Sequence, residues 1–202
     1  MRDLADENAI IAAVRAAESR TRGQIVCVLA RQVCDPSAFV ALYAAALALI
    51  TPWLLLEWTR WSAQFVFAVQ IGVFVVAFLL MGWTRLGVIL TPRAVRRRQA
   101  FRVAQEQFVA RGLRRTSSRA GVLIFVSLAE HYARIVADED LDDQISEAEW
   151  RLAIEELTVN LHEGRITEGF VAAIARSGDL LARAAPPDGG ANELPDHLVR
   201  LN

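Results

Sequence analysis

Two long stretches without a charged residue, Ser37 to Leu56 and Trp61 to Thr84, lie in the first half of the chain. An α-helix rises about 1.5 Å per residue, so each stretch is long enough to cross a hydrocarbon layer of about 30 Å. Residues 57–60 alone separate the two stretches, which is enough for a tight turn and too few for a domain. The sequence therefore predicts a transmembrane hairpin.

The alternative is a buried helical hairpin inside a soluble protein. The chain carries 22 basic and 23 acidic residues in a length of 202, and this remainder is too small and too charged to wrap two fully apolar helices. Neither stretch contains an Asp, Glu, His, Lys or Arg side chain, whereas ion pathways and proton relays need such groups at membrane depth. An anchor is therefore favoured over a buried core and over a transporter.

The arginines predict how the hairpin is oriented. Every basic side chain in the chain is arginine, which is typical of a GC-rich bacterial genome. Positive residues near span ends stay in the cytoplasm, and they flank both outer ends of the hairpin while the turn has Arg60 alone. Met1 to Ile25 is charged and lacks the apolar core of a signal peptide. We expect a multi-pass protein of a bacterial inner membrane with both termini cytoplasmic.

Outside the hairpin, helical and strand patterns alternate. A helix is predicted over 6–20, and the apolar run from Ile25 to Leu29 predicts a central strand. After the hairpin, Thr91 and Pro92 predict the start of a helix. Later segments predict a strong strand over 121–128, an edge strand over 132–137 that pairs with it, helices over 146–161 and 167–183, and a loose tail.

These elements form one α/β domain that the hairpin interrupts, because neither flank alone can bury its apolar faces. We assign residues 1–36 to the first part of the domain, 37–84 to the hairpin with spans 37–56 and 61–84, 85–185 to the second part, and 186–202 to a flexible tail.

Several soluble segments form a recognisable set: Thr21-x-Gly23-Gln24-Ile25-Val26-Cys27-Val28, Gly121 to Val126, Tyr132 to Val136, and two helices separated by Gly164. Together they resemble the TPM domain, a family named after thylakoid lumen, photosystem II repair and bacterial membrane proteins. The resemblance implies an α/β sandwich with a central β-sheet between helices. The chain is most similar to the bacterial membrane subgroup, in which a hairpin follows the first strand. Gln24 stands where the family usually has an acidic residue.

One acidic segment has the spacing of a cation site. Asp138, Asp140, Asp142 and Glu149 match positions 1, 3, 5 and 12 of a calcium loop, which predicts Ca²⁺ or another divalent cation as a ligand. Two observations oppose this hypothesis. Asp143 occupies the place of the usual glycine, and Ser146-x-x-Glu149 also fits a helix capping box.

The helix after Pro92 combines an apolar side, Phe101, Ala104 and Phe108, with a basic one. Arginines near a cytoplasmic interface gain about 1 kcal/mol each from anionic lipid, so we expect them to contact the membrane surface. Nucleic acid is disfavoured as a partner because the sequence offers no aromatic platform and its net charge is −1. The basic side consists of Arg93, Arg96, Arg97, Arg98 and Arg102.

Two classes of function stay open. A membrane-anchored, non-catalytic interaction or assembly module is preferred, with membrane lipids and a protein partner, because the sequence contains none of the common catalytic signatures. The alternative is a weak phosphoester hydrolase that depends on a divalent metal. No catalytic residue is assigned. Small residues in the spans also permit a homo-oligomer; these are Ala41, Ala45, Ala48, Ala68 and Gly72.

Overall fold

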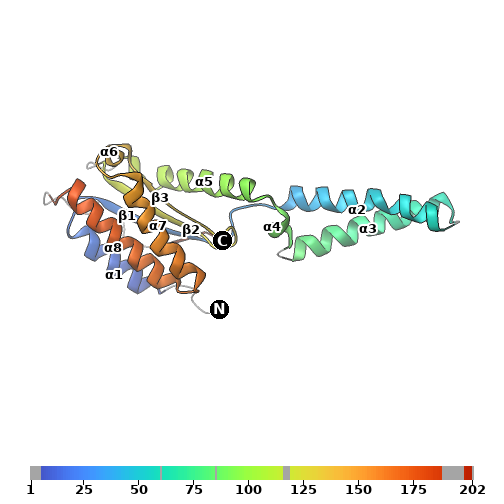
Figure 1. Cartoon of the computed structure of the whole chain (residues 1–202), viewed down its shortest axis with the longest axis horizontal. Coiled ribbons are helices and arrows are strands. Elements are labelled where there is room, and N and C mark those ends of the chain that lie inside the picture. Colours follow the sequence, from blue (N-terminus) through green and yellow to red (C-terminus); the bar gives the residue numbers. More distant parts are fainter. Residues whose placement is uncertain (1–5, 60, 85, 116–118, 188–197, 202) are drawn as a thin grey trace. The chain divides into compact units, whose positions relative to one another are not determined.

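The computed structural model describes residues 6–59, 61–84, 86–115, 119–187 and 198–201. The chain forms two compact units. The α/β domain combines the chain up to Val33 with the chain from Arg98 onward, and the hairpin unit runs from Cys34 to Arg97. Figure 1 shows the elements of both units along the sequence.

A four-stranded mixed sheet with the order β3-β2-β1-β4 forms the centre of the α/β domain. β1 (Gln24–Ala30) and β2 (Gly121–Ser127) lie parallel in the middle, and every residue of both strands is buried. β3 (Tyr132–Ala137) is antiparallel to β2 at one edge, and β4 (Leu198–Leu201) is parallel to β1 at the other. The predicted central strands and the predicted edge strand are therefore confirmed, because strands covered on both faces require continuous apolar runs.

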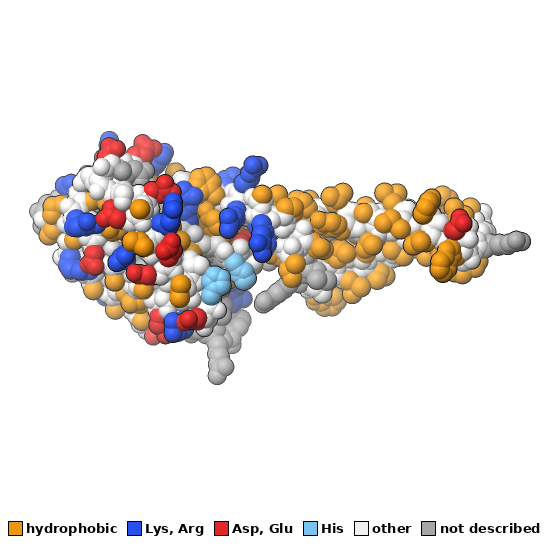
Figure 2. Space-filling view, in the orientation of Figure 1, with side chains coloured by type: hydrophobic (Ala, Val, Ile, Leu, Met, Phe, Trp, Pro, Cys, Tyr) orange, Lys and Arg blue, Asp and Glu red, His pale blue; other side chains and the backbone are white. Residues whose placement is uncertain are grey.

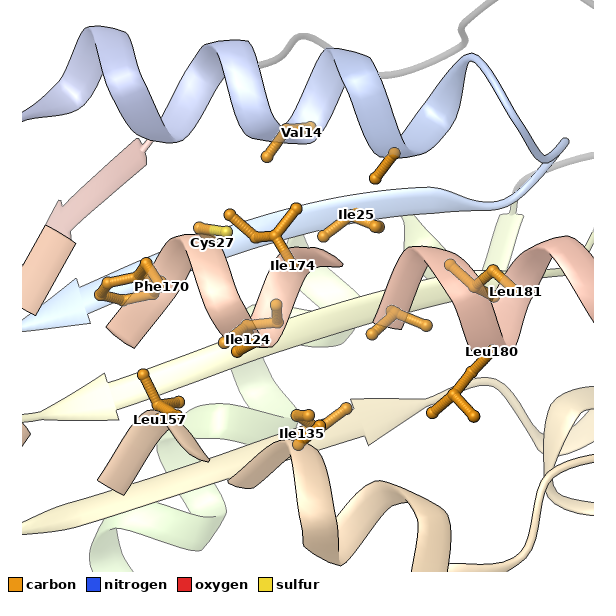
Figure 3. Close-up of a cluster of buried hydrophobic side chains, with 14 of the residues drawn as sticks. Val14, Ile25, Cys27, Ile124, Ile135, Leu157, Phe170, Ile174, Leu180 and Leu181 are labelled. Atoms are coloured by element: carbon orange, nitrogen blue, oxygen red, sulfur yellow. The ribbon is translucent and has the colours of Figure 1, made fainter. Parts of the chain in front are cut away.

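Helices cover both faces of this sheet. α1 (Glu7–Glu18), α7 (Glu147–His162) and α8 (Ile166–Ala184) contribute to the larger core, in which Figure 3 shows apolar side chains of helices and strands turned toward one another. α5 (Arg93–Ala110) contributes to a second core on the other face. The predicted α/β fold with a central sheet between helices is thus confirmed. Two shorter elements complete the domain, the 3-10 helix η1 (Leu113–Arg115) and α6 (Glu139–Asp142).

The last strand corrects the prediction of a loose tail for residues 198–201. β4 pairs with the second half of β1, and its first two side chains, Leu198 and Val199, are 4% and 7% exposed. A four-residue strand next to a segment rich in Pro, Gly and Asn has too little pattern of its own. Residues 198–201 form a strand because they pair with the free edge of β1.

The apolar side of α5 also differs from the prediction. Ala100, Ala104 and Phe108 are buried at a spacing of four residues, whereas Phe101 is 39% exposed. The ring of Phe101 instead lies under the guanidinium of Arg134, 4.5 Å from its centroid. The prediction chose the large residue at 101 over the small one at 100, and close packing on a sheet favours the small one.

The hairpin unit consists of α2 (Ser37–Trp58), α3 (Ala63–Trp83) and the short α4 (Leu86–Leu90). α2 and α3 are long and apolar enough to cross a membrane, and only 17% and 6% of their most apolar windows are buried. Figure 2 shows hydrophobic side chains covering the visible face of these helices. Such low burial does not match the core helices of a soluble protein, which was the alternative interpretation.

Small residues let the helices of the hairpin unit approach one another. Ala44 and Ala48 of α2 are buried, and a Cβ built on Gly87 of α4 would lie 2.8 Å from Val40 Cγ2. Gly72 of α3 does not take part in such a contact, because a Cβ built there meets no described atom within 4 Å. The space next to Gly72 is therefore open and is not filled by α2.

Candidate functional site

The acidic segment that resembles a calcium loop contains the short helix α6. Asp138 is the N-cap of this helix, and its Oδ1 accepts a hydrogen bond from the Glu139 N–H at 2.7 Å. The second oxygen, Oδ2, is buried and has no partner among the described residues. Asp140 Oδ2 lies 3.8 Å from Arg119 Nη1. These carboxylates are thus placed as a helix cap and as half of an exposed ion pair.

Glu149 is fixed at the start of α7. It forms a capping box with Ser146, because Glu149 Oε2 accepts hydrogen bonds from the Ser146 N–H at 3.1 Å and from Ser146 Oγ at 2.9 Å. Its Oε1 accepts a hydrogen bond from Arg183 Nη2 of α8 at 2.5 Å. The hydrogen bond from Arg183, with those from Ser146, lowers the pKa of Glu149 to about 2. The predicted capping box is confirmed.

The structure does not gather the three predicted metal ligands whose side chains it describes, Asp138, Asp140 and Glu149. Within the residues it describes, no three or more His, Cys, Asp or Glu side chains form a group that could hold a metal ion. Asp142 belongs to α6, and its side chain lies outside the described part. Asp143 has helical backbone angles, φ −75° and ψ −21°, at the place where a calcium loop turns on glycine. A cation site at Asp138, Asp140, Asp142 and Glu149 stays a prediction.

The arginines of α5 surround the helix rather than lining one side. At 3.6 residues per turn, Arg93 and Arg97 share the side that continues into the buried alanines, whereas Arg98 and Arg102 lie near the opposite side. Arg96 is half-buried and the other four are exposed. The single basic side is therefore corrected to a basic collar around the first half of α5. Lipid contact through Arg93, Arg96, Arg97, Arg98 and Arg102 stays a prediction.

A groove of about 630 Å³ follows the outer edge of β3. One wall includes Gln105 of α5, and the other wall consists of Ile145 and residues of α7. The guanidinium of Arg134, which stacks on Phe101, forms no ion pair with any described residue. The lining residues are Gln105, Tyr132 to Ala137, Ile145, Glu147, Trp150, Arg151 and Ile154.

Comparison with known protein families identifies the domain. Residues 84–180 match the family model of the TPM domain. This part of the chain matches a TPM domain. The matched residues include α5, β2, β3 and α7, so the β3 groove belongs to the TPM domain. The resemblance found in the sequence is confirmed at this level.

The fold also resembles a solved structure. The NMR structure of the BA42 protein from the psychrophilic bacteria Bizionia argentinensis has a TM-score of 0.61 and 18% sequence identity, over 99% of this chain and 97% of that chain. At this identity the likeness shows the fold alone. Comparison with curated proteins gave no match.

One buried polar group of the TPM domain was missed by the sequence analysis. Glu130, 6% exposed, accepts hydrogen bonds from Ser127 Oγ and, at 3.0 Å, from the Val33 N–H. These contacts lie at the carboxyl ends of the parallel strands β1 and β2, where α/β sheets place ligand sites. The described contacts join the chain after β1 to the β2–β3 turn, which is a structural role. A serine at the end of an apolar run, with a glutamate three residues later, was the available signal.

Proposed function

We propose that this protein is a non-catalytic interaction or assembly module, anchored by the α2–α3 hairpin on the cytoplasmic surface of a bacterial inner membrane. The exposure of the hairpin carries the proposal. Trp53, Trp58 and Trp83 are 81%, 85% and 93% exposed, and they lie on or at the ends of helices that are apolar all round. Lipid suits such helices because they satisfy their backbone polar groups internally.

The arginine distribution supports cytoplasmic termini and a multi-pass topology. In this topology the turn between α2 and α3 faces outward, and the basic collar of α5 lies near the end of the second span. The collar presents arginines in several directions, so headgroup contact does not require one defined helix face. This arrangement supports the proposal that the TPM domain is of the bacterial membrane subgroup.

The β3 groove supports interaction as the role of the anchored domain. An open sheet edge offers unpaired main-chain donors and acceptors, and protein partners use such edges as templates. The groove lies in the TPM domain itself, between β3, α5 and α7. A protein partner therefore fits the observed surface better than a small substrate, for which the described residues show no convergent reactive groups.

A metal-dependent phosphoester hydrolase is the second candidate, supported by the word phosphatase in the name of the matching family model. Asp138 Oδ2, buried and without a described partner, is the atom best placed to accept a cation. The other carboxylates do not complete a cage: Glu149 is engaged by Ser146 and Arg183, and Asp140 pairs with Arg119. A metal at this place would therefore require the segment to rearrange.

Site-specific labelling tests the anchoring. In a background with Cys27→Ala and Cys34→Ala, Thr59→Cys should react with an impermeant maleimide in intact cells, and Ser146→Cys should react only after lysis. The membrane fraction should retain the protein after a high-salt wash. The reverse labelling pattern would place the TPM domain outside and defeat the proposed topology.

A phosphoester panel tests the absence of catalysis. The full-length protein in nanodiscs is assayed with Ca²⁺, Mg²⁺ or Mn²⁺ alone, next to the variants Asp138→Asn and Asp140→Asn. We expect no turnover above that of empty nanodiscs. Turnover that both variants abolish would establish the hydrolase instead of the interaction module.

A further inference from the structure

β3 is an edge strand, and no hydrogen bond to another described residue pairs its outer backbone groups. The Asp138 N–H donates to the Gly121 carbonyl at 3.0 Å, which fixes the alternation of the antiparallel β2–β3 ladder. In such a ladder, residues that exchange both hydrogen bonds alternate with residues whose N–H and C=O point away from the partner strand. Tyr132, Arg134 and Val136 therefore bond to β2. The outward-pointing residues are Ala133, Ile135 and Ala137.

The same alternation sorts the side chains of β3 into two walls. Ile135, with Ala133 and Ala137, packs into the core beneath α7, whereas Val136 and Tyr132 pack into the core that contains α5. The side chains of a strand added next to β3 would likewise alternate between the α7 side and the α5 side. Its side chains on the α7 side would meet Trp150 and Ile154, which are apolar, and those on the α5 side would meet Arg134.

The charges that line the groove favour an acidic ligand. Arg134 has a cation–π contact with Phe101 and no ion pair with described residues. Arg151 forms an exposed ion pair with Glu147 at 3.4 Å, so the groove lining carries two cations and one anion. An acidic side chain next to Arg134 would satisfy a charge that the described domain leaves without a counter-ion.

We propose that the β3 groove binds an extended segment of a partner protein as a fifth strand, with acidic residues on the α5 side and apolar residues on the α7 side. The inference rests on the proposed interaction role and names its docking surface. The recognised pattern is an alternation of Asp or Glu with Val, Ile or Leu over about five to seven residues, the usual length of a strand. Backbone hydrogen bonds supply affinity and the two walls supply specificity.

A second copy of this chain fits the groove less well. Two β3 strands related by a two-fold axis through Ile135 would place Arg134 diagonally across from its own symmetry mate. Like charges at that spacing oppose pairing, and each copy would leave its arginine without an anion. A heterologous acidic strand removes this repulsion.

Peptide selection on the intact protein tests the proposal. A random heptapeptide library is selected on full-length protein in nanodiscs, after depletion on empty nanodiscs, and the enriched peptides are synthesised. Dissociation constants are measured for wild type, Ala133→Pro, Arg134→Gln with Arg151→Gln, and the control Arg176→Gln on α8. Ala133→Pro removes an outward N–H while sparing the β2 ladder, a place where edge strands tolerate proline.

We expect enriched peptides to alternate acidic and apolar residues. Each lost backbone or charge contact should weaken binding about twofold to tenfold, in Ala133→Pro and in the double arginine variant, with no change in Arg176→Gln. N-methylation of alternate peptide amides should abolish binding in one register and be tolerated in the other. This last measurement leaves the protein unchanged, so it tests whether the peptide binds as a strand even if Ala133→Pro does not fold.

Three results would overturn the proposal. The first is no enrichment over empty nanodiscs, and the second is binding that tolerates N-methylation at every peptide amide. The third is a wild-type dimer that Ala133→Pro converts to a monomer, because it assigns the groove to a second copy. Maleimide labelling of Thr59→Cys does not involve β3, so a failed groove and a failed anchor are distinguishable.

Discussion

The two units of the molecule differ in where they place large apolar side chains: the α/β domain buries them and the hairpin unit exposes them. In the α/β domain, Phe170 and Ile174 are fully buried, whereas in the hairpin unit Leu49 and Phe67 are 71% and 63% exposed. Among the described residues, the α/β domain exposes few large apolar side chains: Phe101, Val109, Leu152 and Val159. This difference supports the proposed anchoring, in which water surrounds the domain and hydrocarbon surrounds the hairpin.

Helix packing differs in the same way. In the domain, a Cβ built on Gly178 of α8 would lie 2.7 Å from Ala17 Cβ of α1, so the two helices meet with no spare volume. In the hairpin unit, a Cβ on Gly72 would meet no described atom within 4 Å. Close packing therefore sets the distance between the helices of the domain, whereas much of the hairpin surface is open to surrounding molecules.

Removing a phenyl ring should give the largest contrast. Phe170→Ala should lower the free energy of unfolding of the domain by about 3–5 kcal/mol, because it leaves a cavity in the core. Phe67→Ala deletes the same atoms from the exposed face of α3 and should leave domain unfolding unchanged. Amide exchange of β1 and β2 in nanodiscs measures both. An equal loss in the two variants would show that the units do not have separate cores.

A charge placed on an exposed apolar position should have a large effect in the hairpin and a small effect in the domain. Leu49→Arg, near the middle of α2, should oppose membrane insertion by about 2.5–3.5 kcal/mol. Val159→Arg on α7 puts the same charge on a side chain that is 57% exposed in the domain, and should change stability by less than about 0.5 kcal/mol. Glycosylation-mapped insertion assays and domain melting measure the two effects. Efficient insertion of Leu49→Arg would mean that α2 does not meet lipid.

Adding one methyl group tests the packing contrast. Gly178→Ala should destabilise the domain by about 1–3 kcal/mol, because the new Cβ overlaps Ala17 and the helices must separate. Gly72→Ala should have little effect on association of α2 with α3, since its position is open. Cysteine cross-linking across each helix pair reports the separation. A neutral Gly178→Ala would show that α1 can shift without loss.

The sequence predicted most of the domain because its strands and helices carry their own patterns. β1 and β2 are apolar throughout, and the capping box at Ser146 marks the start of α7. β4 could not be found this way, because its four residues become a strand only beside β1. The apolar side of α5 was placed one residue off, at Phe101, because Phe101 fits the helical spacing to Ala104 and Phe108 as well as Ala100 does.

The candidate site was harder to predict than the fold. The acidic spacing over 138–149 predicts a calcium loop and gives no sign of the short helix α6 that the structure forms there. The β3 groove requires the strand order, the ladder alternation and the helix on each side at once. None of these is encoded in a local motif, which is why the sequence alone suggested an interaction module without its surface.

The smallest expected effect is the loss of stability in acid. It belongs to the domain, because α2 and α3 contain Glu57 as their only acidic residue. The hydrogen bond from Arg183, with those from Ser146, lowers the pKa of Glu149 from 4.5 to about 2. The folded state thus favours the charged carboxylate. Its stabilising contribution is complete above pH 4.5 and is lost as the pH falls toward 2.

Glu149→Gln should therefore flatten the fall in domain stability over this window. The variant should be less stable than wild type at neutral pH, and the two should converge near pH 2, because a protonated Glu149 and the neutral amide of the variant both lack the charge that Arg183 binds. Arg183→Gln should reproduce most of the effect, since its hydrogen bond is the largest cause of the shift. Glu155→Gln, an exposed glutamate on the same helix, should keep the wild-type profile. Amide exchange of α7 and of α2 between pH 2 and pH 6 measures the response. Parallel curves for wild type and Glu149→Gln, or an equal acid response in α2, would show that this contact does not set the acid sensitivity of the domain.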